Sequence, residues 1–344
     1  MIDPGLLQVQ AVDGRVEEHL GRRSLRLKGG IATIAGAHLK DGWIEFDLAF
    51  SGERGFMGAV WRVQDRRNYE EFYVRPHQSG NPDANQYSPV FNGLSGWQLY
   101  HGPRYAVPLS YRFGEWNHVK VLFSGDQAEI YIEDMERPVL LVDGLKRSVE
   151  AGGVGVSAGN FAPAWFSNVS FGAMEAPPIE EGLREPERVP AGVIPSWQVS
   201  DVFSEGVLDG RTELSDEELK RSWTRLETEP SGLANLARVQ GIQLRSNTVF
   251  ARKVLVSDRE RIARLDFGFS DRVRVYLNRR LLYRGDDSYL SRDYRFLGSI
   301  GFFDALYLPL REGENELLMA VSEEVGGWGI QAKLETVAGI AFED

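Results

Sequence analysis

The chain contains no cysteine among its 344 residues. Disulfide bonds, thiolate metal sites, iron–sulfur clusters and cysteine nucleophiles are therefore excluded, and packing must stabilise the fold. Histidine is also scarce, and its five positions form neither an HExxH motif nor a close pair, which argues against a zinc hydrolase. These histidines are His19, His38, His77, His101 and His118.

Long apolar runs and an excess of positive charge are missing as well. No segment approaches the roughly 18 apolar residues of a membrane-spanning helix, so we expect no membrane insertion. The first residues lack the pattern of a secretory signal, which predicts a cytoplasmic protein as printed, or a secreted or periplasmic one if a leader was removed. Lysine and arginine number 39 against 50 aspartates and glutamates, for a net charge of −11. This balance disfavours nucleic acid as a partner.

Several nucleotide and hydrolase motifs are absent. The chain has no GxGxxG sequence at a strand–helix junction, no phosphate-binding loop and no GxSxG elbow, since Gly93-Leu94-Ser95-Gly96 has the wrong spacing. Nucleotide chemistry and serine hydrolysis are therefore not expected.

Glycine, in contrast, is plentiful at 37 residues, and aromatic residues make up 11% of the chain. Apolar and polar residues alternate in many short segments, as at 44–50, which is typical of strands with one buried face. The segments 118–123 and 128–133 are separated by four small or polar residues that favour a tight hairpin. The sequence thus predicts an all-β fold of β-sandwiches or jelly rolls. Further strands are expected at 24–27, 55–63, 69–75, 87–91, 97–101 and 153–157.

The length predicts two domains, at about 150 residues each. Residues 173–190 contain four prolines and five glutamates and form the clearest break in composition, which indicates a linker. We therefore expect a first domain at 1–172 and a second at 191–344. In the second, Ser215 and Glu218 form a capping-box pattern that predicts a short helix over 216–221. Its strands are expected at 250–256, 262–267, 272–277, 281–283, 305–308, 315–322 and 329–334.

Five motifs in the first domain resemble known proteins. The run 55–65 with Asn68-Tyr69 and Phe72-Tyr73, and the later segments 116–121 and 128–134, resemble core strands and the penultimate hairpin of concanavalin A-like, laminin-G-like jelly rolls. The resemblance covers about 20–172. It implies a β-sandwich whose relatives bind glycans or proteins, and some of which cleave glycans.

The second domain resembles the galactose-binding-like jelly roll that is attached to many glycosidases. Two segments carry the resemblance, 275–280 and 310–317, which match a V-x-L-N-G hairpin and an L-x-x-G-x-N-x-L strand. Arg279 stands where that family usually has glycine, so the turn departs from the family pattern while the strand pair fits. The match covers about 250–335 and implies a fold rather than a ligand.

A carboxylate motif distinguishes the glycan-cleaving members of the concanavalin-like class from the glycan-binding ones. Glucanases of the concanavalin-like class carry E-x-D-x-E or E-x-D-x-x-E on a strand, because terminal carboxylates must flank the glycosidic bond. Here Glu45 and Asp47 are present and the last carboxylate is missing. We interpret the pair as part of a solvated sheet face.

The richest candidate site lies between residues 69 and 105, where aromatic rings, amides and guanidinium groups gather on long connections. Sugars need aromatic faces for stacking and planar polar groups for their hydroxyls. A strand over 71–77 would place alternate side chains in a polar-aromatic row, although these groups would equally serve to cover the sandwich edge. The predicted ligand-binding residues are Tyr73, Arg75, His77, Trp97, Tyr100 and His101.

Two weaker sites are also predicted. Asn81, Asp83 and Asn85 alternate like the start of a calcium loop, but later positions lack the required glycine and bidentate carboxylate, so an ordinary polar turn is favoured. No other cofactor is expected. The Asn168-Val169-Ser170 triplet meets the glycosylation rule, which needs a secretory host. A secondary ligand site in the second domain is formed by Tyr289, Arg292, Asp293 and Trp328.

The leading interpretation is a lectin-like protein that binds a glycan or small sugar without catalysis. One alternative stays open from the resemblance to bacterial concanavalin-like proteins: a sugar hydrolase acting on modified disaccharides, in which Glu71 and His77 would serve as acid and base. A protein-interaction scaffold is a further alternative. The oligomeric state is not predicted.

Overall fold

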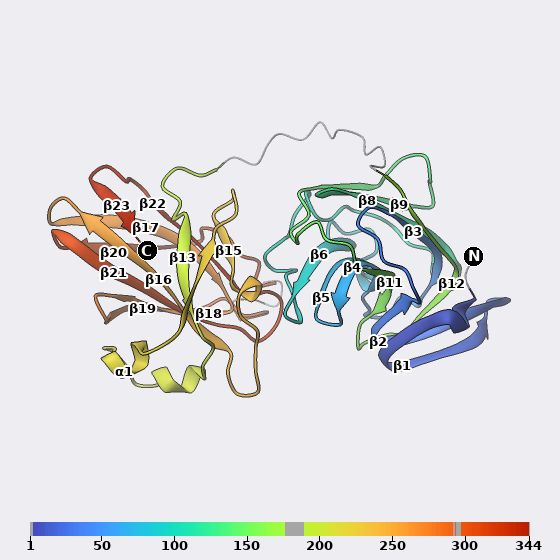
Figure 1. Cartoon of the computed structure of the whole chain (residues 1–344), viewed down its shortest axis with the longest axis horizontal. Helices are drawn as coiled ribbons and strands as arrows, with labels where there is room; N and C mark the ends of the chain where they lie inside the picture. Colours follow the sequence, from blue (N-terminus) through green and yellow to red (C-terminus); the bar gives the residue numbers. More distant parts are fainter. Residues whose placement is uncertain (1–2, 176–188, 292, 294–296, 344) are drawn as a thin grey trace. The chain divides into compact units, whose positions relative to one another are not determined.

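The computed structural model describes residues 3–175, 189–291, 293 and 297–343 (Figure 1). The chain is all-β and divides into two compact units. The first is Met1–Gly93 with Tyr100–Arg184, and the second is Leu94–Leu99 with Glu185–Asp344. Most of the expected linker, 176–188, lies outside the described residues. No helix in the described part of the chain combines the length and the apolar character that crossing a membrane requires.

The first unit is an antiparallel sheet folded over on itself. Its strand order is β10-β9-β8-β3-β12-β2-β11-β4-β5-β6, and β1 pairs with β2. Two 3₁₀ turns accompany the strands, η1 (Pro4–Leu6) and η2 (Pro76–Gln78). The strands are β1 (Leu7–His19), β2 (Arg22–Ile34), β3 (Gly42–Ala49), β4 (Met57–Asp65), β5 (Asn68–Val74), β6 (Asn85–Phe91), β8 (Asn117–Ser124), β9 (Gln127–Ile132), β10 (Leu140–Asp143), β11 (Gly153–Ala158) and β12 (Ala164–Ala173).

The β1–β2 hairpin joins the two halves of this sheet. Along one edge of β2, residues up to Leu27 pair with β12, and residues from Gly30 onward pair with β11. Gly29 has φ +72°, a left-handed conformation that glycine adopts without strain, at the point where the partner changes. The same edge thus contributes to both layers of a β-sandwich, and β1 covers the other edge of β2 throughout.

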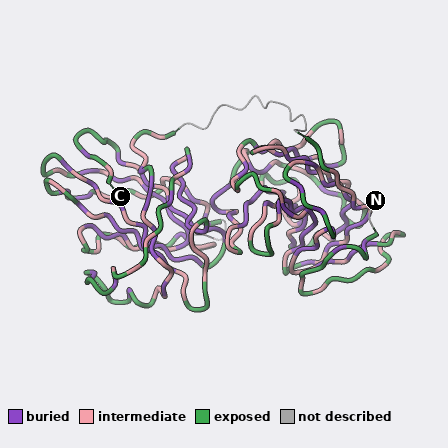
Figure 2. The backbone as a smooth tube through the Cα atoms, in the orientation of Figure 1, coloured by how far each residue is buried: buried purple, intermediate pink, exposed green. Residues whose placement is uncertain are grey.

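Alternating side chains fill the space between the layers. Phe46 on β3, Trp61 on β4, Phe72 on β5 and Phe166 on β12 are completely buried. Figure 2 shows buried backbone concentrated along these strands and exposed backbone at the loops and on the β1–β2 hairpin. The alternation expected at 44–50 therefore has its apolar members in the core.

The second unit is built from two antiparallel sheets. One has the order β14-β13-β16-β21-β18-β19 with β23 beside β16, and the other the order β15-β22-β17-β20. The 3₁₀ turn η3 (Glu205–Leu208) and the helix α1 (Asp216–Leu219) lie between β13 and β14 of the first sheet, and the 3₁₀ turn η4 (Leu236–Arg238) lies between β15 and β16. The strands are β13 (Ser196–Ser200), β14 (Trp223–Glu227), β15 (Leu233–Asn235), β16 (Thr248–Ser257), β17 (Arg261–Ser270), β18 (Arg272–Leu277), β19 (Arg280–Asp286), β20 (Asp304–Leu310), β21 (Gly313–Ser322), β22 (Gly329–Leu334) and β23 (Ile340–Glu343). The unit also includes the two-residue strand β7 (Leu94–Ser95), which lies in neither of these sheets.

A compact apolar cluster anchors the helix to the first of these sheets. Phe203 stacks near Phe250, with ring centres 4.9 Å apart, and Leu219 of α1 packs against the cluster. The predicted capping box is present, because Glu218 accepts a hydrogen bond from the Ser215 amide at 2.8 Å. The helix nevertheless ends at Leu219, two residues earlier than expected.

Three local expectations differ from the structure. Residues 97–101 form turns rather than a strand, because the Leu99 amide bonds back to the Gly96 carbonyl at 2.9 Å. The long strand β1 was not expected, since both of its faces carry many exposed or half-buried residues. At the Asn278-Arg279 turn both residues have positive φ, 50° and 71°, so arginine adopts the conformation for which the family pattern uses glycine.

Candidate functional site

The register of β3 against β8 brings a histidine between two carboxylates on the side of the first sheet that faces away from the core. Asp47 on β3 lies opposite His118 on β8, and Glu45 lies two residues earlier on the same side. His118 Nδ1 is 2.6 Å from Asp47 Oδ1, and His118 Nε2 is 2.9 Å from Glu45 Oε1. The imidazole is therefore held at both nitrogens.

Asp47 has further partners that fix its position. The Asn168 amide donates to Asp47 Oδ2 at 2.6 Å, and Arg22 at the start of β2 forms an ion pair with the same oxygen. Asn168 has φ +51° and lies where the pairing of β12 with β3 shifts register between Ser167 and Ser170. Because of this β-bulge, the Asn168 side-chain amide points toward Asp47 on β3. The nitrogen of the predicted glycosylation triplet is thus used in a side-chain contact.

The carboxylates change the protonation of His118. Partial burial lowers the pKa of the imidazole, but hydrogen bonds to Asp47 and Glu45, together with their negative charges, outweigh burial and raise the pKa above its usual value. Both ring nitrogens can donate only in the protonated imidazole, so the contact pattern and the direction of the shift agree.

Tryptophan rings flank this polar group. Trp165 on β12 stacks on His19 with ring centres 4.0 Å apart, and Trp116 meets the same histidine edge-on at 6.0 Å. The Arg22 guanidinium lies 5.1 Å from the Trp116 ring centre. Both tryptophans are half-buried. We call the whole group the His118 face; it comprises His19, Arg22, Glu45, Asp47, Trp116, His118, Trp165 and Asn168.

The predicted row on β5 lies beneath the surface. Tyr73 is 5% exposed and Arg75 6% exposed. Arg75 donates to the Tyr73 hydroxyl at 3.0 Å, to the Asp83 carbonyl at 2.9 Å and to the side chain of Gln86. The face of β5 that was expected to meet solvent is therefore packed as well, because the Phe56 ring lies against Tyr73 and the Gln86 side chain accepts hydrogen bonds from Tyr73 and Arg75.

The other predicted ligand residues are spread over both units. His77 is half-buried in η2, Glu71 is half-buried on β5, Tyr100 is 1% exposed and His101 is exposed. Trp97 belongs to the second unit, where its ring lies 6.1 Å edge-on from Tyr289. Two residues from separately predicted sites thus lie together. The segment 69–105 does not form one continuous surface.

The predicted calcium residues have other partners. The Asn85 amide donates to the Val107 carbonyl at 3.0 Å and to the Tyr111 hydroxyl at 3.2 Å, deep in the unit. Asn81 is exposed and donates to Gln78, and Asp83 is half-buried. Within the described residues, no group of three or more histidine, aspartate or glutamate side chains is placed to hold a metal ion.

In the second unit, Trp328 is a core residue. It is completely buried, and its indole nitrogen donates to the Val321 carbonyl at 3.0 Å. Tyr289 and Asp293 are half-buried, and Arg292 lies outside the described residues. The predicted pairing of Trp328 with the 283–294 loop as a ligand site therefore does not hold for the tryptophan, because a fully buried indole offers no face to a ligand.

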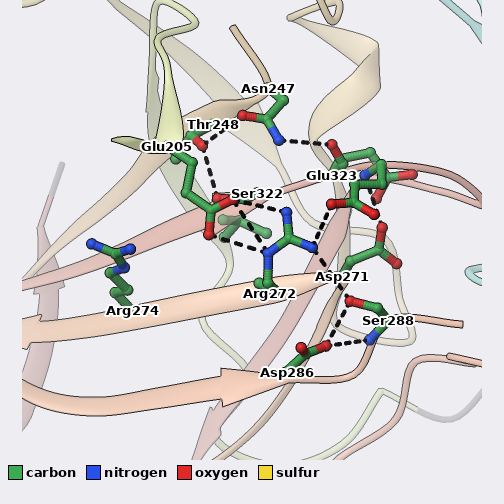
Figure 3. A network of polar contacts seen from close by, with 12 residues as sticks. Glu205, Asn247, Thr248, Asp271, Arg272, Arg274, Asp286, Ser288, Ser322 and Glu323 are labelled. Carbon is green, nitrogen blue, oxygen red and sulfur yellow. Dashed lines mark hydrogen bonds and ion pairs between the residues drawn. The ribbon is translucent and has the colours of Figure 1, made fainter. Parts of the chain in front are cut away.

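A charged network at the ends of β18 and β21 was not predicted (Figure 3). Arg272 donates to Glu205 at 2.8 and 3.1 Å and forms an ion pair with Glu324 at 2.8 Å. Beside it, Asp271 and Glu323 are each 1% exposed. Asp271 accepts the backbone amides of 324 and 325 at 2.8 and 3.2 Å, whereas Glu323 Oε2 has no partner among the described residues.

Two shallow depressions lie away from the His118 face. One, of about 360 Å³, is on the first unit and includes Gln8, Thr33 and Asp65 in its lining. The other, of about 520 Å³, is on the second unit and includes Arg252 and Arg311. The lining of neither depression includes a predicted ligand residue or a residue of the His118 face.

Comparisons with known proteins show a distant likeness of fold. No protein-family model and no curated protein matches the chain. Among solved structures, a carbohydrate-binding module, CBM66 from Bacillus subtilis, is 22% identical over 47% of this chain and 93% of that one, with a TM-score of 0.35. A protein of unknown function with a galectin-like fold from Bacillus subtilis is 8% identical over 46% and 85%, with a TM-score of 0.33.

A putative glycosyl hydrolase from Parabacteroides distasonis is 13% identical over 44% of this chain and 81% of that one, with a TM-score of 0.32. The likeness is therefore to carbohydrate-binding modules, galectin-like proteins and glycosidase β-domains, and it concerns the all-β sandwich fold alone.

Sequence reasoning missed the His118 face. From the sequence, Glu45 and Asp47 are interpreted as a pair on a solvated sheet face, and His118 as an isolated histidine. The sequence signal was present in two strand segments, 44–50 and 117–123, but only their pairing register shows that Asp47 and His118 are neighbours.

Proposed function

We propose that the first unit binds carbohydrate without catalysis, at the His118 face. The observation that carries the proposal is the imidazole of His118 clamped by Glu45 and Asp47, with Trp165 on β12 and Trp116 directly before β8. Charged planar groups pair with sugar hydroxyls, and indole rings stack on the C–H face of a pyranose.

The polar groups are pre-organised for this task. Asp47 is held by three donors, from Arg22, His118 and Asn168, so it loses little conformational freedom when a ligand binds. Glu45 and His118 keep about a third of their side-chain surface exposed. They can therefore reach hydroxyl groups while Asp47 stays fixed beneath them.

Binding is favoured over hydrolysis by the composition of β3. Glycosidases need two carboxyl groups on opposite sides of the glycosidic bond, one as acid and the other as nucleophile or base. After Glu45 and Asp47, the next residue on this side of β3 is the buried Ala49. Glu45 and Asp47 themselves are both bound to His118. The arrangement offers recognition groups and no separate acid and nucleophile.

A glycan array probed with the full chain, followed by calorimetric titration of the best ligand, tests the proposal. Trp116→Ala should weaken binding by about 1–3 kcal/mol, because a half-buried ring on the face would lose its stacking contact. Asp47→Asn should weaken it by about 1–3 kcal/mol through the loss of the clamp. Trp223→Ala, which removes a half-buried tryptophan from the second unit, is the matched control and should leave affinity unchanged.

Two results would contradict this assignment. If Trp116→Ala and Asp47→Asn bind every ligand as the parent does, the His118 face is not the site. If binding is abolished by Trp97→Ala or by His101→Ala instead, the ligand occupies the segment 69–105 that the sequence predicts. Turnover of an oligosaccharide that Asp47→Asn removes would support an enzyme.

A further inference from the structure

A second group of aromatic residues in the first unit carries an unusual positive charge. The Phe56 ring lies between three others, with ring centres 5.8 Å from Tyr73, 5.5 Å from His77 and 5.6 Å from Phe161. Phe56 and His77 are half-buried, and Phe161 is 51% exposed. We call these four residues the Phe56 cluster. It shares no residue with the His118 face.

Two arginines contact the Phe56 cluster. The guanidinium carbon of Arg54 lies 4.8 Å from the Phe161 ring centre and 6.0 Å from that of Phe56. The guanidinium carbon of Arg75 lies 5.0 Å from the Tyr73 ring centre and 5.9 Å from that of Phe56. Arg54 is exposed, so one cation lies at the surface of the cluster and the other beneath it.

Among the described residues, no ion pair balances the charge of Arg75. Its hydrogen bonds go to a hydroxyl, to a side-chain amide and to the backbone carbonyls of Asp83 and Asn85, all of them uncharged acceptors. A buried guanidinium is normally paired with a carboxylate, because removing an unpaired charge from water is expensive. Arg75 therefore places beneath the cluster a positive charge that no contacting carboxylate neutralises, while the negative charges of Glu71 and Asp83 act from the surroundings.

The neighbouring positive charges affect the pKa of His77. Partial burial lowers the pKa of its imidazole, and the positive charges of Arg54 and Arg75 lower it further, while Asp83 acts in the opposite direction. Its Nδ1 atom is buried without a hydrogen-bond partner among the described residues. The histidine is thus held neutral by two neighbouring cations and has unused hydrogen-bonding capacity.

We propose that Arg54, His77 and the Phe56 cluster bind an oxyanion, a carboxylate or sulfate group carried by a ligand. The exposed Arg54 guanidinium would contact the anion directly, Arg75 would stabilise it from beneath, and the exposed Phe161 edge would contact the body of the ligand. This site shares no residue with the His118 face, so anion binding here can be tested independently of the proposed function.

NMR of the histidine side chains in the full chain tests the proposal, with sodium glucuronate and sodium sulfate as probes and glucose as the neutral control. An anion beside His77 should stabilise its protonated form, so its titration midpoint should move to higher pH at saturation. The signals of His118 should not move. A response to glucuronate alone identifies a carboxylate ligand, and a response to sulfate alone identifies a sulfate ligand.

Two variants distinguish anion binding at this site from a general effect of the positive charge of the protein. Arg54→Gln should weaken the anion at least about tenfold, because one charge-assisted hydrogen bond is lost at a surface position that the core does not need. Arg66→Gln, which removes an exposed arginine from the turn between β4 and β5, is the control and should leave affinity unchanged. The proposal is overturned if neither anion moves the His77 signals, or if the two variants weaken binding equally.

Discussion

The buried acid pair at the end of β21 predicts a stability that depends on pH. Glu323 and Asp271 are both buried, and no ion pair within the described part of the chain neutralises either of them, because Arg272 is paired with Glu205 and Glu324 (Figure 3). Burial, and then the negative charge of Asp271, raise the pKa of Glu323 well above its ordinary value of 4.5. Glu323→Gln removes the titrating proton while keeping the size of the side chain.

Asp271 is the member of the pair that ionises more easily. Burial also raises its pKa, but the backbone amides of 324 and 325 donate to Asp271 Oδ2 and act against burial. Glu323 accepts only the Gly327 amide, at 3.0 Å, and its other oxygen has no partner among the described residues. The folded protein therefore keeps a proton on Glu323.

Because the pKa of Glu323 is raised on folding, the free energy of unfolding should fall as the pH rises. The folded state binds the Glu323 proton more tightly than the unfolded chain does, so this group contributes most to stability below pH 4.5. Its contribution is lost as the pH rises through the raised folded value. Between these limits the free energy of unfolding should fall by up to about 1.4 kcal/mol per pH unit for one proton.

Urea unfolding of the parent and of Glu323→Gln, followed by circular dichroism over a pH series from about 5 to about 8, measures this contribution. The two proteins should be similar at the acid end, and the variant should become progressively more stable than the parent as the pH rises. Glu324→Gln is the matched control, because that side chain is 62% exposed and its ion pair is worth only about 0–1 kcal/mol. Parallel curves for the parent and Glu323→Gln would refute the reasoning.

Two further predictions concern the second unit. Trp328→Ala should lower the free energy of unfolding by about 3–5 kcal/mol, measured by urea unfolding, because it empties a completely buried position; a loss below about 1 kcal/mol would contradict the core assignment. Gln98→Ala should cost about 2–4 kcal/mol in the same assay, because the Gln98 side chain donates to the Leu297 carbonyl at 2.8 Å and accepts from the buried Ser270 hydroxyl at 3.0 Å. Gln78→Ala, which removes one exposed hydrogen bond to Asn81, is its control, and an equal effect of the two changes would count against a structural role for Gln98.

Local patterns in the sequence predicted the local elements well. The hairpin expected from 118–133 is β8 and β9, with the turn at Gly125 in the left-handed conformation that its glycine permits. The capping box at Ser215 and Glu218 is present. In both cases the interacting groups lie within a few residues of each other, so no knowledge of the tertiary fold was needed.

Long-range pairing was not predictable from the same patterns. β1 carries polar and exposed residues on both faces and gains its order from twelve paired residues of β2, so its own alternation gave little signal. The contact of His118 with Asp47 joins residues 71 positions apart. It depends on the register of β3 against β8, and a shift of one residue would send either side chain to the core.

The segment 94–99 shows why composition alone cannot separate ligand-binding residues from residues that the fold buries. Trp97 and Gln98 have the residue types that a sugar site uses, an aromatic ring and an amide. The same types also serve to insert a loop into a protein interior, where an amide can satisfy buried carbonyls and hydroxyls. Gln98 is completely buried, its backbone amide donates to the Gly326 carbonyl at 2.8 Å, and its carbonyl accepts the Ile300 amide at 3.0 Å. Composition identifies groups capable of recognition, and only burial decides whether they recognise a ligand or another part of the chain.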